Sequence, residues 1–309
     1  MDMTLQDKAI IVTGAGAGLG LAYAREIARQ GASVVVNDVD QIVADSAVSR
    51  IREEGGKAVA CAVPVGTTDA ATLLVSASLK AFGRLDGLVT NAGTLRDKSV
   101  LKMSDDDFDS VIQVHLRGTF TCVREAYRHF KENDVQGSIV CIGSPTGQRG
   151  NFGQTNYAAA KAGIVGMVRT WALEMKKAGV QINAAIPVAS TAMTRTVPYF
   201  RKAIEAEDRQ SPMPAFFRHD LGFGTAEDVA GLVAYLVGGD LGETGQVLGI
   251  GGDRLQVWTH PLPEATEYHD GGWSYDDLAR DLPALVSAHR QPVGEEFLPL
   301  PEELRPEES

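Results

Sequence analysis

Short apolar runs alternate with longer segments of helical periodicity through the first 250 residues of the chain. The apolar runs predict strands at about 8–13, 32–37, 57–63, 86–91, 137–143, 180–186 and 246–249. The segments between them predict helices near 18–30, 41–54, 68–82, 104–132, 153–178 and 226–237. Because the runs are apolar throughout instead of alternating with polar residues, helices are expected to cover the strands on both faces.

This order of elements predicts an α/β fold. We expect a Rossmann-type doubly wound parallel sheet of about seven strands with helices on both faces, since such crossovers are right-handed and place helices on either side. Ligands of these sheets bind at the carboxyl ends of the strands. The residues predicted to meet there are Gly14, Asp38, Asn91, Ser144 and Pro187.

Two segments do not follow the alternation. Residues 190–224 are long, contain Pro and aromatic residues, and follow the sixth strand, so we interpret them as a substrate lid; an ordinary surface connection is the alternative. Residues 1–253 are predicted to form one catalytic domain. Residues 254–309 are rich in Pro and acidic residues, and they form a C-terminal extension with one helical pattern near 274–288. We expect the extension to drape over the main domain or a neighbouring subunit, with residues after about 290 as candidates for disorder.

Charge and cysteine content narrow the function classes. Forty acidic and twenty-nine basic side chains give a net charge of −11, which argues against nucleic acid and anionic membrane surfaces as partners. Cys61, Cys122 and Cys141 lie in apolar runs at irregular spacing, so we expect free thiols in a reducing compartment and no metal site. The first residues, MDMTLQDK, contain no apolar targeting stretch, and a cytoplasmic protein is expected.

A glycine-rich turn joins the first predicted strand to the first helix. Residues 13–20 read TGAGAGLG, and glycines in this context let the backbone approach a pyrophosphate at the helix N-terminus. Asp38 follows eighteen residues after Gly20, at the end of the second strand, where a carboxylate accepts hydrogen bonds from ribose hydroxyls and repels a 2′-phosphate. Since no Arg or Lys lies beside it, the sequence favours NAD over NADP.

A second motif indicates acid–base chemistry. Tyr157 and Lys161 are four residues apart and therefore share a helix face, and Ser144 lies thirteen residues before Tyr157. A neighbouring cation lowers the pKa of a phenol from its usual value of about 10, so that it can act as a general base or acid. A Tyr and a Lys at this spacing often share a solvated face by chance. The nucleotide motif 130 residues earlier favours the catalytic interpretation.

These motifs together resemble the short-chain dehydrogenase/reductase family over residues 5–253. The matching pieces are TGAGAGLG, Asn91–Gly93, the Ser144, Tyr157 and Lys161 set, and Asn183–Pro187. NAGTLRDKSV, HLRGTF and GNFGQTNYAAAKAG look more narrowly like the hydroxyacyl-CoA dehydrogenase domain of peroxisomal multifunctional enzyme type 2 and its bacterial hydroxysteroid and hydroxyacyl-CoA dehydrogenase relatives. The resemblance implies NAD-dependent oxidation of a secondary alcohol to a ketone, in a homotetramer or homodimer.

The resemblance also implies roles for single residues. Tyr157 would be the acid/base, Lys161 would lower its pKa and hold the nicotinamide ribose, and Ser144 would orient the substrate oxygen. Asp38 matches the ribose-binding acid. The remaining positions that match cofactor-binding ones are Gly14, Gly18, Leu19 and Gly20 in the phosphate turn, Asn91, Ala92 and Gly93 after strand four, and Pro187 after strand six.

The chain departs from the family pattern at four positions. His115 stands where most members have a catalytic Asn; it either supports a proton-relay water or packs inside its helix. Pro145 follows Ser144 and restricts the backbone there. Pro64 replaces an Asp that contacts adenine, and Val188 replaces a Gly after strand six. The nicotinamide amide contact is therefore unassigned, with Thr191 and Thr194 as candidates.

The substrate is the least determined feature. Basic residues near the expected cleft mouth are either partners for a CoA phosphate or solvated charges: Arg96, Lys98, Lys102 and Arg149. Apolar residues of the lid region either wall a pocket for a bulky substrate or form plain core: Phe152, Met193, Tyr199, Met213, Phe216, Phe217 and Phe223. We rank a hydroxyacyl-CoA first and a free hydroxysteroid or other hydrophobic alcohol second. A non-catalytic NAD-binding protein is the rival from another class.

Overall fold

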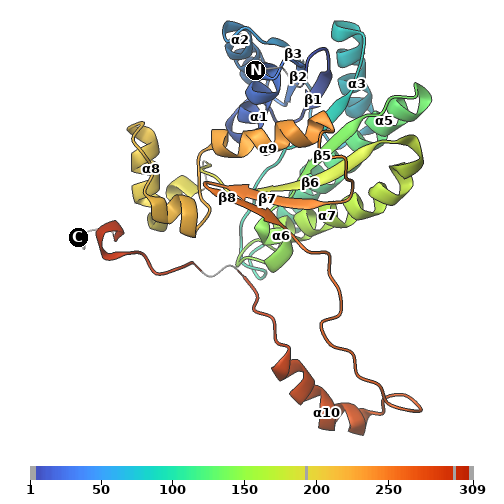
Figure 1. The fold of residues 1–309 in the computed structure, drawn as a ribbon, viewed down its shortest axis with the longest axis vertical. Coiled ribbons are helices and arrows are strands. Elements are labelled where there is room, and N and C mark those ends of the chain that lie inside the picture. Colours follow the sequence, from blue (N-terminus) through green and yellow to red (C-terminus); the bar gives the residue numbers. More distant parts are fainter. Residues whose placement is uncertain (1–4, 192–193, 295–296, 306–309) are drawn as a thin grey trace.

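A single sheet of eight strands runs through the molecule (Figure 1). The computed structural model describes residues 5–191, 194–294 and 297–305. The strand order is β3-β2-β1-β4-β5-β6-β7-β8. The strands are β1 (Ala9–Val12), β2 (Ser33–Asp38), β3 (Lys57–Ala62), β4 (Gly87–Thr90), β5 (Ser138–Ile142), β6 (Gln181–Pro187), β7 (Val247–Gly251) and β8 (Arg254–Val257).

The seven predicted strands are all present, and they pair in parallel. The strand order reverses at β1, which pairs with β2 on one side and with β4 on the other, so the ligand crevice of a doubly wound sheet is expected here. The predicted fold class is confirmed, but the strand count needs correction. β8 is an eighth, antiparallel strand that returns along β7 after a turn at Gly252, whose φ is +51°. Its residues, RLQV, include two polar side chains and are mostly exposed, so they do not form an apolar run like those of the other strands.

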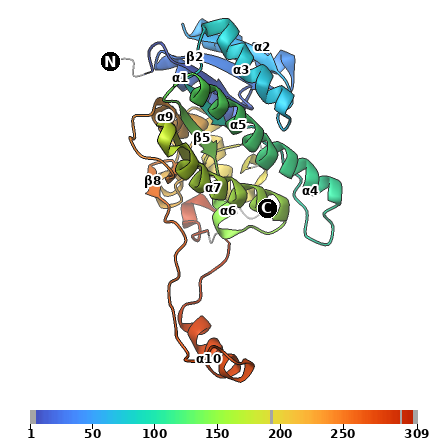
Figure 2. The same ribbon diagram turned by 90° about the vertical axis from the view of Figure 1, so that its right-hand side faces the viewer.

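Helices cover both faces of the sheet (Figures 1 and 2). One hydrophobic core lies between the sheet and α1, α2 and α9, and a second lies beneath α3, α5 and α7. The long helices are α1 (Gly18–Arg29), α2 (Gln41–Glu53), α3 (Thr68–Phe82), α5 (Gly118–Glu132), α7 (Thr155–Met175) and α9 (Ala226–Gly238). The shorter ones in this part are α4 (Asp105–Val111), α6 (Pro145–Arg149) and the 3-10 turn η2 (Lys176–Ala178).

The predicted helix 104–132 is interrupted by a different helical geometry. α4 begins with a capping box at Ser104 and Asp107, and α5 follows without a break in the chain direction. Between them, η1 (Ile112–Arg117) is a π-helix. Such wide turns inside α-helices occur frequently at functional sites, and this one carries His115.

The lid region has its own small core. Within residues 190–191 and 194–224 lie η3 (Thr194–Thr196), η4 (Pro198–Phe200), α8 (Arg201–Asp208) and η5 (Phe216–Asp220). Phe217 and Phe223 are fully buried and pack with Phe200 and Met213, while Tyr199 and Phe216 pack against that cluster. Phe152 is 91% exposed, and Met193 lies outside the described residues. Most of the predicted pocket wall is therefore core of the lid.

The C-terminal extension leaves the body and returns to it. After β8, the chain extends to α10 (Tyr275–Ala288), which begins at the N-cap Ser274 as predicted and stands away from the body (Figures 1 and 2). The end of the described chain then reaches the lid. Tyr199 donates its hydroxyl to the carbonyl of Leu298 at 2.6 Å, and Leu300 and Leu304 pack on the lid core near η6 (Glu302–Leu304). The division at residue 253 stays a prediction, although β8 belongs to the sheet.

Candidate active site

The glycine-rich turn leaves room for a phosphate. Gly14 has a φ of +61°, and a Cβ added to it would lie 2.7 Å from Cα of Ala92. A Cβ on Gly20 would collide with the carbonyl of Gly14, whereas Gly18, with a φ of +56°, faces open space. In the described chain no side chain caps α1, because its N-cap is Ala17. Uncapped N–H groups and the helix dipole both favour an anion, so this turn fits a dinucleotide pyrophosphate.

Asn91 and Thr13 fix the ends of β1 and β4 against each other. The Nδ2 of Asn91 donates to the carbonyls of Thr13 and Gly14 at 3.1 and 3.0 Å. The Oγ1 of Thr13 accepts from the backbone N–H groups of Asn91 and Ala92 at 3.0 and 3.1 Å. These bonds hold the phosphate turn to the strand end beside Gly93. Asn91 was predicted as a cofactor-binding residue at this strand end. Thr13 was not predicted as a site residue, although it is the first residue of the glycine-rich motif.

Asp38 lies at the end of β2, next to the same turn. Its Oδ2 accepts from the backbone N–H of Gly16 at 3.2 Å, and its Oδ1 accepts from that of Val39 at 2.8 Å. Among the described residues, no basic side chain forms an ion pair with it. Asn37, which is buried, donates to the carbonyls of Cys61 and Val63 and so joins β2 to the end of β3. Pro64, just beyond, is exposed.

The predicted acid–base residues meet in one place. Tyr157 and Lys161 lie on consecutive turns of α7, with the Lys161 Nζ 5.6 Å from the centroid of the Tyr157 ring. Ser144 follows β5 as the N-cap of α6, and its side chain lowers the pKa of the Tyr157 phenol. Pro145 is at the first position of α6, where its missing N–H costs nothing. The Nζ of Lys161 donates to the carbonyl of Ile142 at 2.7 Å.

Burial dominates the electrostatics of this set. Burial raises the pKa of the Tyr157 phenol, Ser144 lowers it, and the Asp97 charge raises it further. In this geometry burial outweighs the effect of Ser144, and the Lys161 ammonium donates to the Ile142 carbonyl; the lowering of the phenol pKa by Lys161 stays a prediction. Burial lowers the pKa of Lys161 itself from 10.5 to about 8. An amine whose pKa lies close to the working pH is suited to accepting and releasing protons.

His115 closes the site from η1. Its ring meets Tyr157 edge-on with centroids 5.1 Å apart, and it lies against Gly93, where a Cβ would collide with it. The Nε2 is within hydrogen-bond distance of the Thr94 N–H and carbonyl, at 3.0 and 2.8 Å, while no described residue reaches the buried Nδ1. Burial, and then the Lys161 charge, lower its pKa to about 3. The imidazole is therefore neutral, buried and in contact with the catalytic phenol.

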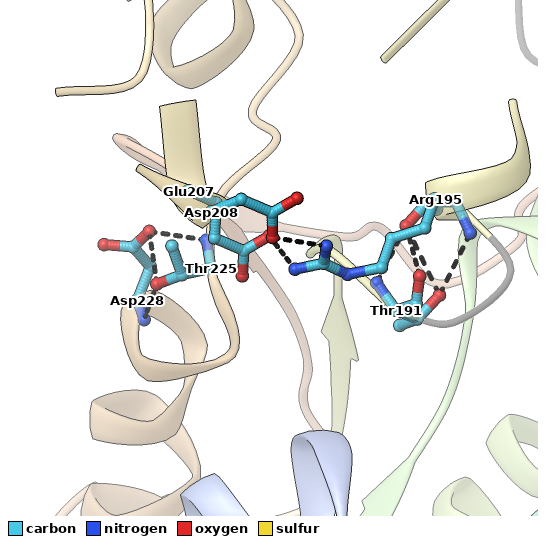
Figure 3. A network of polar contacts seen from close by, with 7 residues as sticks. Thr191, Arg195, Glu207, Asp208, Thr225 and Asp228 are labelled. Atoms are coloured by element: carbon cyan, nitrogen blue, oxygen red, sulfur yellow. Dashed lines mark hydrogen bonds and ion pairs between the residues drawn. The ribbon is translucent and has the colours of Figure 1, made fainter. Parts of the chain in front are cut away.

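The segment after β6 connects the site to the lid. Pro187 ends β6, and Val188, which follows, packs against the lid core. Thr194 donates its hydroxyl to the carbonyl of Thr191 at 3.0 Å, so these two residues partly satisfy each other. Figure 3 shows Arg195 directed at Glu207 and Asp208 on α8, with N–O distances of 2.8 and 2.7 Å. Figure 3 also shows the capping box of α9, in which the Thr225 hydroxyl meets Asp228.

Three of the four basic residues expected at the cleft mouth have side-chain partners among the described residues. Lys98 pairs with Asp107 at 2.7 Å, and the Arg96 Nη1 donates to the carbonyl of Leu95 at 2.8 Å. The Arg149 Nε donates to the carbonyl of Gly294 in the extension at 3.0 Å. Arg96 and Lys102 are exposed. Among the described residues no group of three metal-ligating side chains forms, and no helix is long and apolar enough to span a membrane.

The fold and this constellation define a dehydrogenase of the Rossmann type, and the comparison with known families agrees. The profile of the short chain dehydrogenase family matches residues 8–201, so the chain belongs to that family. Its members generally bind NAD or NADP, and the chain is an oxidoreductase acting on alcohol groups.

Three similar proteins place the chain within the family. Mouse peroxisomal multifunctional enzyme type 2 is 44% identical over 199 residues; the match covers 62% of this chain and 26% of that enzyme, so the chain spans about a quarter of it. A 3-oxoacyl-[acyl-carrier-protein] reductase of Thermotoga maritima is 37% identical over 252 residues, covering 81% of this chain and 98% of the reductase. The crystal structure of a short chain dehydrogenase from Mycobacterium avium superposes with a TM-score of 0.79 at 32% identity, covering 94% and 98% of the two chains.

Proposed function

We propose that the chain oxidises the secondary alcohol of a bulky 3-hydroxyacyl thioester to a ketone, with NAD as the hydride acceptor. The observation that carries this proposal is the meeting of Ser144, Tyr157 and Lys161 at the carboxyl end of the sheet, beside an uncapped helix N-terminus. A protein that only binds a nucleotide has no use for a buried phenol held between a hydroxyl and an ammonium.

The chemistry follows from the contacts of these side chains. A bound nicotinamide supplies the hydride acceptor. Ser144 holds the substrate oxygen by a hydrogen bond, and the Tyr157 phenolate oxygen takes its proton. The amine of Lys161, whose pKa is about 8, is one turn away to stabilise the phenolate and release a proton to solvent. Acid–base help of this kind contributes about a hundredfold to ten-thousandfold in rate.

The choice of NAD rests on Asp38. Its carboxylate is fixed by the backbone of Gly16 and Val39 beside the phosphate turn, so its charge cannot swing away from a ribose. A 2′-phosphate at that place would meet this charge without a compensating base among its described hydrogen-bond and ion-pair partners. We assign the ribose to Asp38, the phosphates to Gly14, Gly18, Leu19 and Gly20, and the remaining cofactor contacts to Asn91, Ala92, Gly93 and Pro187.

The choice of a thioester rests on the relatives. The Thermotoga relative is named for a 3-oxoacyl-[acyl-carrier-protein], and it matches over nearly its whole length. The free hydroxysteroid stays the alternative, because Phe217 and Phe223 are buried in the core of the lid and favour neither bulky substrate. Arg96 and Lys102 stay exposed at the expected cleft mouth, where they can meet a phosphate of the carrier.

A homodimer is the assembly we propose, through the outer face of α5 and α7. A hollow of about 800 Å³ lies on this face, lined by Leu116, Phe120 and Met167. Phe120 and Leu173 are 39% and 78% exposed. The lining also carries opposite charges, Asp106 and Asp109 on α4 and Arg117 on η1, so two copies related by a twofold axis can pair an acidic part of one lining with the basic part of the other.

The testing experiment is NADH formation at pH 9 by the purified chain. The substrates are 3-hydroxybutyryl-CoA, a longer 3-hydroxyacyl-CoA and a free hydroxysteroid, with NADP+ in place of NAD+ as the cofactor control. We expect turnover of a thioester with NAD+, and loss of at least a hundredfold in kcat in Tyr157→Phe with NADH binding retained. Turnover of the steroid alone, or near wild-type turnover in Tyr157→Phe, would show the proposal to be wrong.

A further inference from the structure

A chain of hydrogen bonds leads from the catalytic serine to an exposed carboxylate, Asp97. The Oγ of Ser144 accepts from the backbone N–H of Thr146 at 3.2 Å. The hydroxyl of Thr146 donates to the Oε1 of Gln154 at 3.2 Å, and the Nε2 of Gln154 donates to Asp97 at 2.7 Å. Asn151 donates to the same Oε1 at 3.0 Å. Asp97 and Gln154 lie in the segments NAGTLRDKSV and GNFGQTNYAAAKAG, but the resemblance assigned a role to Ser144 and to neither of them.

The same loop is tied to the start of α7 at two further points. The backbone N–H of Lys98 donates to the carbonyl of Gly153 at 2.9 Å. Asn156, which is fully buried, donates to the carbonyls of Arg96 and Asp107. Both chain neighbours of Asp97, Arg96 and Lys98, are therefore hydrogen-bonded to the start of α7. These contacts fix the position of Asp97 relative to Tyr157, which follows Asn156 on that helix.

We propose that Asp97 and Gln154 are positioning residues of the Ser144–Tyr157 site. Gln154 fixes Ser144 through Thr146, and the Asp97 carboxylate opposes the negative charge that Tyr157 acquires when it gives up its proton. The inference rests on the proposed function, since it concerns the proton that the reaction moves.

The charges around Tyr157 show why Asp97 matters. It is the charged group whose field raises the pKa of the phenol in this geometry, after the effect of burial. The other polar and titratable groups that face the phenol are Lys161 on α7, His115 on η1, Tyr23 on α1 and Ser144 after β5. These four groups are neutral, or are cationic in part of the pH range. Of the two cations that flank Asp97, Lys98 is bound to Asp107 and Arg96 donates to the carbonyl of Leu95. Asp97 is therefore the anion that keeps the phenol protonated to higher pH.

The test is Asp97→Asn, which removes the charge while its amide oxygen can still accept from Gln154. Asp105→Asn is the matched control, because Asp105 is exposed and causes no shift at Tyr157. With 3-hydroxybutyryl-CoA and NAD+ between pH 6 and 10, the rise of kcat/KM with pH should be displaced to lower pH in Asp97→Asn. At pH 7 its kcat/KM should exceed the wild-type value by about threefold to tenfold, as expected for removing one charge that is partly screened by solvent. Asp105→Asn should follow the wild type.

Gln154→Leu tests separately the proposal that Gln154 positions Ser144. It leaves the Asp97 charge and removes the support of Thr146, so kcat should fall about tenfold while KM for NAD+ is unchanged. The proposal is overturned if the Asp97→Asn profile matches the wild type, if Asp105→Asn shifts equally, or if Gln154→Leu keeps full kcat.

A second readout works without any substrate. The absorbance of phenolate near 295 nm, recorded against pH for each protein minus its Tyr157→Phe version, isolates the titration of Tyr157. A lower midpoint in Asp97→Asn supports the proposal, and an unchanged midpoint overturns it. If all alcohols fail to react but the midpoint moves, the proposed function is wrong and the role of Asp97 stands.

Discussion

Replacing Lys161 by Met should make the protein more stable at pH 7. Lys161 is 3% exposed, and burial lowers its pKa from 10.5 to about 8. At pH 7 the folded chain therefore contains a buried charge, and the depressed pKa corresponds to a cost of about 3 kcal/mol. Met is similarly long and unbranched and fills the same space, but it leaves the Ile142 carbonyl without its donor, which costs about 1 kcal/mol. The net expectation is a gain of about 2 kcal/mol in the free energy of unfolding.

The pH dependence of the free energy of unfolding provides a second test of this stability difference. Between about pH 8 and 10.5 the unfolded chain holds the Lys161 proton and the folded chain does not, so unfolding takes up a proton and wild-type stability rises with pH. Above this window both states are neutral, and the wild type keeps its hydrogen bond to Ile142. The advantage of Lys161→Met should therefore shrink through the window and change sign above it.

Urea unfolding at pH 7 and at pH 10.5, at one fixed protein concentration, measures the stability difference between the two proteins and its change with pH. Lys176→Met, on an exposed residue of η2, is the control and should change stability by less than about 0.5 kcal/mol. A Lys161→Met protein less stable than the wild type at pH 7, or a stability difference independent of pH, would refute the reasoning. The expected result would mean that the active site holds a charge at the expense of stability.

Two further predictions concern the cofactor turn and His115. Gly14→Ala should weaken NADH binding, measured by fluorescence titration, and lower stability by about 2 kcal/mol or more, because φ is positive and Ala92 is 2.7 Å from the new Cβ; unchanged binding would contradict the proposed phosphate turn. His115→Asn should reduce the loss of stability between pH 7 and 5 by about 2 kcal/mol, since the folded pKa is about 3 and the unfolded chain takes up the proton below 6.5. Equal losses in the two proteins would mean that the imidazole is not held neutral.

The sheet and the catalytic set could be predicted because each depends on local sequence. The apolar runs that became β1 to β7 are uniform enough to show strands buried on both faces, and Tyr157 and Lys161 are one helical turn apart whatever surrounds them. The spacing from Gly20 to Asp38 is likewise set by one helix and one strand.

The features that could not be predicted depend on burial and on distant contacts. The direction of the Tyr157 pKa is decided by the surroundings that close over it, and a sequence shows the neighbouring Lys161 but not the desolvation. The π-helix at η1 has no local signal of its own. Gln154 was missed because its partners, Asp97 and Thr146, come from two other segments of the chain. For the aromatic residues of the lid the sequence left a pocket wall and plain core open, because hydrophobicity does not show which side a residue faces.

The outer strands of the sheet have a consequence for solubility. An uncovered strand edge offers free N–H and carbonyl groups to a strand of another molecule, which is a route to fibrils. Here β8 is four residues long and follows a tight return, with Arg254 turned to the carbonyl of His219. At the opposite edge, β3 begins with Lys57, and the guanidinium of Arg52 occupies the carbonyl of Ala58 at 2.8 Å. Both edges are therefore poor templates for a foreign strand, so a sheet made of β-branched, highly apolar strands can stay dispersed at high concentration.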